Sequence, residues 1–150
     1  MLNKDFREVL SALSAEGVDY LLVGAYALAA HGLPRATRDV AVWVRCSEEN
    51  AERTWRALAM FGPPMKGLTP ADLCKPGTVI QIGVAPCRID ILTSIEGVEF
   101  DEAAARRDSI ELGGLSVPVI SRADLAANKR ACGRPQDLVD LEALQQLGNE

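Results

Sequence analysis

The sequence has little of what marks several protein classes. One histidine and four cysteines, without a CxxC pair, are too few and wrongly spaced for a structural zinc site. No apolar run approaches the ~18 residues that a membrane-spanning helix needs. Basic residues are fewer than acidic ones, 16 against 21, and the net charge of −5 argues against binding nucleic acid through bulk charge. A local basic patch would have to be built from Arg35, Arg38, Arg45, Lys129, Arg130 and Arg134.

What is present is the composition of an ordinary soluble globular protein, 48% hydrophobic and 25% charged. A length of 150 residues suits one domain with a real core and is too short for two, so we expect a single domain over residues 1–150. The first ten residues, MLNKDFREVL, are charged and amphipathic, unlike a secretory signal. We therefore predict a cytoplasmic protein without a membrane partner. Its cysteines, expected to be buried reduced thiols, are Cys46, Cys74, Cys87 and Cys132.

Hydrophobic periodicity and turn residues predict a mixed β-sheet flanked by helices, an α/β (α+β) fold. Apolar residues at helical spacing predict a first helix that ends near Gly17. Later helices are expected from Ser47 to about Phe61, at Thr69–Asp72, at Phe100–Arg107, from Ser121 to about Cys132, and from Pro135 to near Gly148. Strands are expected at Tyr20–Val23, after Asp39, at Thr78–Val84 and Cys87–Leu92 as an antiparallel pair, and at Ser109–Leu112 and Leu115–Val119 as a hairpin across Gly113-Gly114.

The stretch from Tyr20 to Arg45 carries the most unusual chemistry. A buried strand is followed by Gly24, a short apolar helix over Ala25–Ala30, a basic linker, and Asp39 at the start of a second β-branched strand. A glycine at a helix start lets a phosphate approach the backbone, and the helix N-terminus supplies N–H donors. A carboxylate on the next strand would be well placed to hold a metal ion against that phosphate.

A second carboxylate lies inside the apolar strand before Leu92. Asp90 shares a face with Arg88 and Leu92, opposite Ile89 and Ile91. An ionised group is costly in such a strand unless it is paired or bound to metal. We expect Asp39 and Asp90 to lie on neighbouring strands and to face one cleft, with Val40, Val42 and Val44 facing the core.

These segments resemble the core of the nucleotidyltransferase superfamily and, more narrowly, the small bacterial group related to AbiEii-type toxins. The resemblance rests on the order of its motifs along nearly the whole chain. They are Gly24, Ala30-His31-Gly32, Arg35-Ala36-Thr37-Arg38-Asp39, Arg88-Ile89-Asp90-Ile91-Leu92, Ser121-Arg122-Ala123-Asp124-Leu125, Asn128-Lys129-Arg130 and Gly133-Arg134-Pro135-Gln136-Asp137.

The resemblance implies a nucleotidyltransferase-like single domain that uses Mg²⁺ and a nucleoside triphosphate (NTP). The catalytic residues it implies are Asp39, Asp90, Lys129 and Asp137, of which Asp39 and Asp90 are the metal ligands. Nucleotide contacts are implied for Gly24, Ala25, Arg38 and Lys129. Without the resemblance, Lys129 reads equally as a surface lysine and Asp137 as a first-turn acid of the last helix. His31 is expected to form a structural hydrogen bond.

The chain departs from the family pattern at two positions. Ala25 stands where such enzymes carry a second small residue, Gly or Ser, and Ala41 stands where they carry a second carboxylate. Residues two apart in a strand point to the same side, so Ala41 leaves the site beside Asp39 one ligand short.

Two functions therefore stay open. The first is a metal-dependent nucleotidyltransferase, in a toxin–antitoxin-like setting, that transfers NMP from an NTP to an acceptor such as tRNA, with an antitoxin protein as a candidate partner. The second is a catalytically inactive relative that binds a nucleotide or a partner. A natural Ala41 favours the second, and an Ala41 introduced to silence a toxic enzyme leaves the first untouched. In a third reading, Glu96 or Asp137 fills the empty ligand position.

Overall fold

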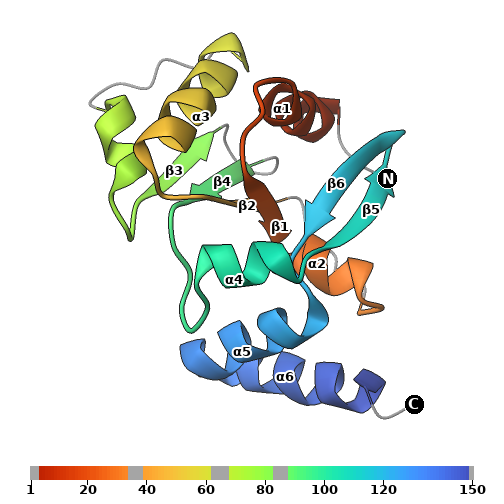
Figure 1. Ribbon diagram of the computed structural model, residues 1–150. Coiled ribbons are helices and arrows are strands. Elements are labelled where there is room, and N and C mark those ends of the chain that lie inside the picture. The colour runs from red at the N-terminus through yellow and green to blue at the C-terminus, as the bar shows by residue number, and fades with distance from the viewer. Residues whose placement is uncertain (1–3, 34–38, 62–67, 83–87, 149–150) are drawn as a thin grey trace.

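A computed structural model describes residues 4–33, 39–61, 68–82 and 88–148. The strands are β1 (Tyr20–Val23), β2 (Asp39–Val44), β3 (Val79–Ile82), β4 (Arg88–Leu92), β5 (Asp108–Leu112) and β6 (Leu115–Val119). The helices are α1 (Lys4–Ala15), α2 (Gly24–Ala30), α3 (Glu48–Phe61), the 3₁₀ helix η1 (Pro70–Cys74), α4 (Phe100–Ala105), α5 (Arg122–Cys132) and α6 (Pro135–Gly148). Figure 1 shows the helices arranged around the strands.

The strands form one six-stranded mixed sheet in the order β3-β4-β2-β1-β6-β5. β1 pairs antiparallel with β2 and parallel with β6, and β2 pairs parallel with β4. The predicted antiparallel pair of β3 and β4 and the predicted hairpin of β5 and β6 are both confirmed. The expected mixed sheet flanked by helices is therefore the observed fold.

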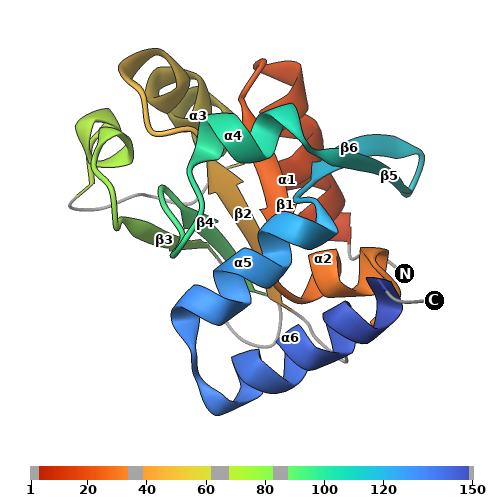
Figure 2. The same ribbon diagram turned by 60° about the horizontal axis from the view of Figure 1, so that its bottom comes forward.

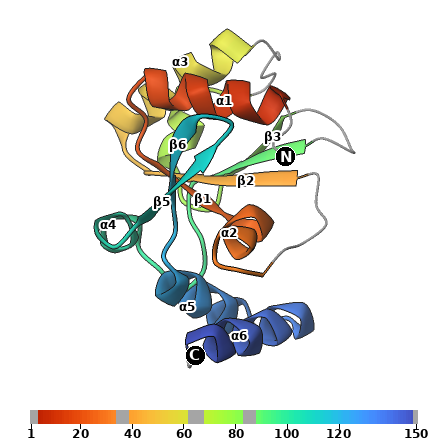
Figure 3. The same cartoon turned by 90° about the vertical axis from the view of Figure 1, so that its right-hand side faces the viewer.

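Helices cover both faces of the sheet. In Figure 3, α1 and α3 lie on one side, and α2, α5 and α6 lie on the other. Val40, Val42 and Val44 are fully buried, as predicted from their alternation along β2. On the opposite face of β2, the buried ring of Trp43 meets Phe100 of α4 edge-on, with the ring centroids 5.0 Å apart.

Local sequence signals account for most element boundaries. Ser121 caps α5 by accepting a hydrogen bond from the Asp124 backbone N–H, and Thr69 with Asp72 forms the predicted capping box of η1. His31 ends α2, and its Nε2 lies 2.7 Å from the Ile120 carbonyl oxygen, the structural hydrogen bond that was expected.

One helix is shorter than predicted. α4 ends at Ala105 instead of Arg107, because β5 already begins at Asp108 and the chain must turn between them. The cysteines that the structure describes, Cys46, Cys74 and Cys132, are free but only half-buried, so the predicted burial of these thiols is wrong; Cys87 lies outside the described residues. Within those residues, none of the helices has the length and apolar character needed to cross a bilayer.

Candidate functional site

The two predicted metal ligands lie on adjacent parallel strands. The register of β2 and β4 places Ala41 opposite Asp90, and Asp39 opposite Arg88. Because alternate residues point to the same side, Asp39, Ala41 and Asp90 share the sheet face that α2 and α5 cover. The expected placement on neighbouring strands is therefore observed, and the role of the two carboxylates as metal ligands stays a prediction.

Arg88 lies between these carboxylates. Its Nη2 is 3.5 Å from Asp39 Oδ2, and its Nε is 3.2 Å from Asp90 Oδ1. The second pair is close but not aligned as a hydrogen bond, so Asp90 Oδ1 is buried without a hydrogen-bond partner among the described residues. The two-residue spacing of Arg88 and Asp90 already placed them on one face, but the sequence did not reveal that the arginine also reaches Asp39.

The turn between β1 and α2 explains why residue 24 is glycine. Gly24 has a φ of +72°, a conformation that side chains with a Cβ rarely adopt. A Cβ built on it would lie 3.1 Å from the Ala41 Cβ, so the turn runs directly over position 41. A side chain at position 24 would therefore crowd Ala41.

Beside the turn is a cavity of about 330 Å³. The sheet side supplies Gly24, Ala41 and Leu92, the connection after β4 supplies Glu96, and α5 supplies Asn128 and Lys129. Asp39 and Asp90 flank this cavity on the same sheet face without lining it. Two hollows of about 580 and 400 Å³ lie elsewhere, and none of the described residues that line them belongs to the predicted site.

Two predicted nucleotide contacts are not placed at the cavity. Ala25 lies half-buried in the first turn of α2 and is not among the described residues that line the cavity. Arg38 lies outside the described residues. Arg45 does not belong to the basic patch considered above, because it lines another hollow and pairs with Asp19 and Asp101. Those contacts hold it at the far end of β2.

Lys129 is held inside a charged network between α5 and α6. Its Nζ lies 3.4 Å from Asp137 Oδ1 and 3.4 Å from Asp140 Oδ2, and the three side chains are only 14%, 3% and 4% exposed. Arg134 donates to both oxygens of Asp137, and Gln136 donates to Asp140. The sequence reasoning missed Asp140, although it lies three residues after Asp137 on the buried face of α6.

The electrostatics of this network fix the charge of Asp137. Its hydrogen bonds from the Arg134 side chain hold the pKa of the carboxyl below its usual range, against the opposing effect of burial. The same contact raises the pKa of the Arg134 guanidinium. Asp137 also accepts from the Arg134 backbone N–H and lies in the first turn of α6, which is the position of the alternative first-turn acid. With both oxygens bonded, Asp137 gives no support to the idea that it fills the ligand position at Ala41.

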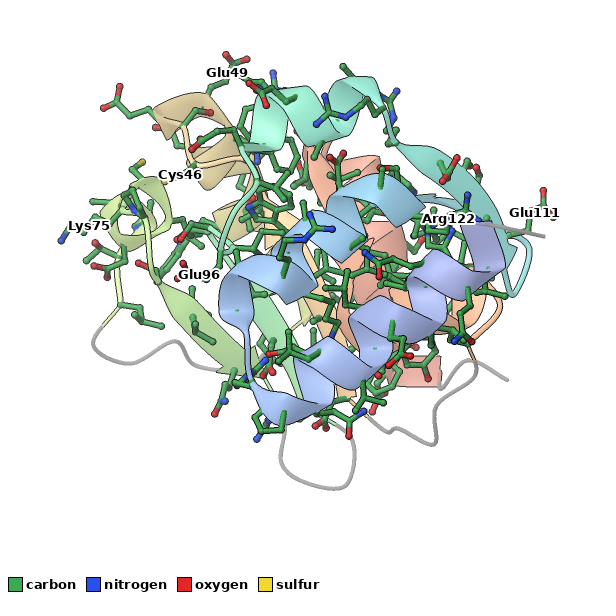
Figure 4. The ribbon with its side chains drawn as sticks, turned by 90° about the horizontal axis from the view of Figure 1, so that it is seen from below. Cys46, Glu49, Lys75, Glu96, Glu111 and Arg122 are labelled. Carbon is green, nitrogen blue, oxygen red and sulfur yellow. The ribbon has the colours of Figure 1, made fainter. Side chains whose placement is uncertain are left out.

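Close packing of the connection after β4 sets the position of α5. A Cβ on Gly97 would lie 2.6 Å from the Ala131 Cβ, and Asn128 Nδ2 donates to the Glu96 carbonyl oxygen over 2.9 Å. Figure 4 shows α5 running from Arg122 toward Glu96, and Figure 2 shows the same helix crossing the sheet. This contact turns Lys129 toward the cavity and keeps Glu96 at its edge.

The donor set suits a single divalent ion. Two carboxylates on one face, one of them with a buried oxygen that lacks an aligned donor, match what Mg²⁺ takes from a protein when phosphates and waters supply the rest. Among the described residues, no group of three or more His, Cys, Asp or Glu side chains could enclose an ion. Asp39 and Asp90 are the residues that could hold such an ion, and Ala41 supplies no ligand beside them.

Comparison with solved structures identifies the fold. The chain is similar to a candidate nucleotidyltransferase from Thermotoga maritima, with 18% identity, a TM-score of 0.58, and coverage of 95% of this chain and 89% of that one. It is also similar to the lincosamide antibiotic adenylyltransferase LnuA bound to lincomycin, with 12% identity, a TM-score of 0.60, and coverage of 98% of both chains. No protein-family model and no curated protein matches the sequence. At these identities the likeness shows the nucleotidyltransferase fold; the toxin-related subgroup stays a prediction.

Proposed function

We propose that this protein binds a nucleoside triphosphate with a divalent metal ion, and that the reaction of its site is nucleotidyl transfer. One observation carries the proposal. Asp39 and Asp90 share a sheet face beside the Gly24 turn, and the cavity next to them is lined by both Gly24 and Lys129. Carboxylates, an open backbone turn and a fixed cation are the three elements that a bound triphosphate requires.

Each residue has a distinct role in this proposal. Asp39 and Asp90 hold the metal ion, which would neutralise charge on the phosphates and orient them. Gly24 lets a phosphate reach the backbone without a side chain in the way. A lysine ammonium has three N–H donors, so Lys129 can keep its contacts to Asp137 and Asp140 and still offer one donor to a phosphate oxygen. Asp137 and Asp140 act as positioning residues for Lys129.

In the transfer itself, the oxygen of an acceptor hydroxyl forms a bond to the α-phosphorus of the NTP. The bond to the pyrophosphate breaks, and the acceptor loses its proton. By resemblance the acceptor is an RNA such as tRNA, and the setting is a cytoplasmic toxin with an antitoxin partner. LnuA is an adenylyltransferase seen with lincomycin, so a small hydroxyl-bearing molecule is the second acceptor to test.

The alternative function is a nucleotide-binding protein without transfer activity. Ala41 favours it, because this position faces Asp90 across the strand pair and offers no carboxylate for a second ion. Glu96 is the remaining candidate for that ligand, because it lines the same cavity as Ala41.

Calorimetry tests the binding step. ATP, GTP, CTP and UTP are titrated with and without Mg²⁺ into the protein and into Lys129→Gln. We expect metal-dependent binding of at least one NTP, weakened about tenfold or more in the variant because a charged donor to the phosphates is lost. If the variant binds NTP as tightly as the wild type and unfolds at the same temperature, Lys129 does not contact the nucleotide. The absence of binding to any NTP would reject the proposed function.

The variant Ala41→Asp separates transfer from binding alone. We expect little transfer with Ala41 and a clear gain when the carboxylate is added beside Asp39 and Asp90. Transfer of labelled NMP to tRNA, to total RNA, to protein and to lincomycin is measured for both forms. If the Ala41→Asp variant binds Mg²⁺ and NTP but transfers no NMP to any acceptor, the non-catalytic function is established.

A further inference from the structure

Arg88 occupies the place where a cation is expected. It projects from β4 directly opposite Asp39 and two residues before Asp90, and its guanidinium reaches both carboxylates. Two acidic groups brought together on one sheet face repel each other unless a positive charge lies near them. In the structure that charge comes from the chain itself.

The ion pairs of Arg88 are longer and less well aligned than the Arg106–Asp124 pair of the same protein. Arg106 donates two aligned hydrogen bonds to Asp124, from Nη2 to Oδ1 at 2.7 Å and from Nε to Oδ2 at 3.1 Å. Arg88 instead divides its nitrogens between two carboxylates, at 3.5 Å and at an unaligned 3.2 Å. A planar guanidinium binds best as a fork on a single carboxylate, so the divided arrangement is the weaker one.

We propose that Arg88 is a built-in competitor of the metal ion. Its guanidinium neutralises Asp39 and Asp90 in the metal-free protein, and a divalent ion must displace it from Asp90 Oδ1 to bind. The side chain is 37% exposed, which leaves it room to swing away. The affinity of the site for metal is therefore set by Arg88 as well as by the two carboxylates. This inference rests on the metal site of the proposed function and not on transfer activity.

Removal of the competitor tests the proposal directly. The binding of Mn²⁺ alone is measured by electron paramagnetic resonance for the wild type, Arg88→Gln, Arg88→Lys and Arg45→Gln. Arg45 is the matched control, because it also pairs with two carboxylates and its loss changes the net charge equally. We expect Arg88→Gln to bind Mn²⁺ about tenfold more tightly or better, since a unit positive charge at contact distance from both carboxylates is removed.

The other variants should fall between the wild type and Arg88→Gln. Arg88→Lys keeps the positive charge but loses the planar guanidinium that reaches both carboxylates, so the Mn²⁺ affinity of this variant should rise less. The Mn²⁺ affinity of Arg45→Gln should stay within about twofold of the wild type, because Arg45 lies at the far end of β2. An Arg88→Gln affinity equal to that of the wild type or of Arg45→Gln would overturn the proposal.

Thermal unfolding supplies a second readout. Without metal, Arg88→Gln should melt below the wild type, because the positive charge that contacts both Asp39 and Asp90 is lost. Added Mg²⁺ should raise its Tm more than that of the wild type. An equal rise in both proteins would argue against competition.

The inference and the proposed function can fail separately. Tighter Mn²⁺ binding in Arg88→Gln without binding of any NTP would keep the inference and reject the function. Wild-type binding of NTP and metal with no response to Arg88 would do the reverse. If no variant binds Mn²⁺, the inference is rejected, and the proposed function is decided by the NTP titrations alone.

Discussion

Two pairs of acidic residues lie on the same side of the molecule and differ in how fully their oxygens are hydrogen-bonded. Asp137 and Asp140 are buried between α5 and α6, where Lys129, Arg134 and Gln136 supply their hydrogen bonds and ion pairs. Asp39 and Asp90 lie at the sheet face and share Arg88, with one buried oxygen of Asp90 left without an aligned donor. A saturated network holds structure in place, whereas an unsaturated one is ready to take a ligand.

The sharpest test of this contrast is Asp137→Asn. We expect a loss of about 3 kcal/mol of unfolding free energy, because one acid of a buried ion network is removed while its cations remain. Because the folded pKa of Asp137 is lowered, its contribution is fully present above the unfolded pKa of about 3.9 and disappears as the pH falls through the folded value. Urea unfolding at pH 7 and at pH 3 should show a large difference between variant and wild type at the first pH and a smaller one at the second. A pH-independent difference would contradict the assignment.

Asp90→Asn should act on binding and scarcely on folding. We expect Mg²⁺-dependent NTP binding to fall by about a hundredfold, beyond the effect of most indirect contacts to a metal. Stability should change by less than about 1 kcal/mol, since the pair with Arg88 is partly exposed. Asp101→Asn is the control, because that acid also pairs with an arginine but at the far end of β2. The contrast between the two acid pairs fails if Asp90→Asn unfolds the protein as Asp137→Asn does.

Gly97→Ala probes the link between the two regions. The new Cβ would lie 2.6 Å from the Ala131 Cβ at a φ of +79°, so α5 must shift and stability should fall by about 2 kcal/mol. Lys129 moves with α5, so NTP affinity should fall too. Gly114→Ala, at a φ of +82° with nothing within 4 Å and not among the residues that line the cavity, separates backbone strain from the displacement of α5 and should lose about 1 kcal/mol without loss of affinity. Equal NTP affinities in the two variants would show that α5 does not position the site.

The sequence predicted what local rules decide. Alternation along β2 placed Val40 and Ala41 on opposite faces, and the glycine pair of the hairpin and the cap at Ser121 were each recognisable without tertiary information. The relative placement of Asp39 and Asp90 followed from strand phase once the two strands were taken as neighbours.

The contacts of the candidate site could not be read in the same way. That Arg88 reaches Asp39 depends on the register of two strands almost fifty residues apart, which no periodicity reveals. The burial of Lys129 against Asp140 depends on how α5 and α6 pack, and a lysine near the end of a helix reads equally well as a solvated side chain. Long-range pairing, which short motifs do not encode, decided both.

The parallel pairing of β1 with β6 has a consequence for how the protein is made. β1 lies in the middle of the sheet, but one of its two neighbours is β6, which pairs Leu22 with Val119. Contacts between such distant segments form late, because the long loop must close before the pairing stabilises it. During synthesis Gly24 and Asp39 leave the ribosome well before Asp90 and Lys129. The growing chain therefore cannot assemble the proposed nucleotide site until its last third has been translated.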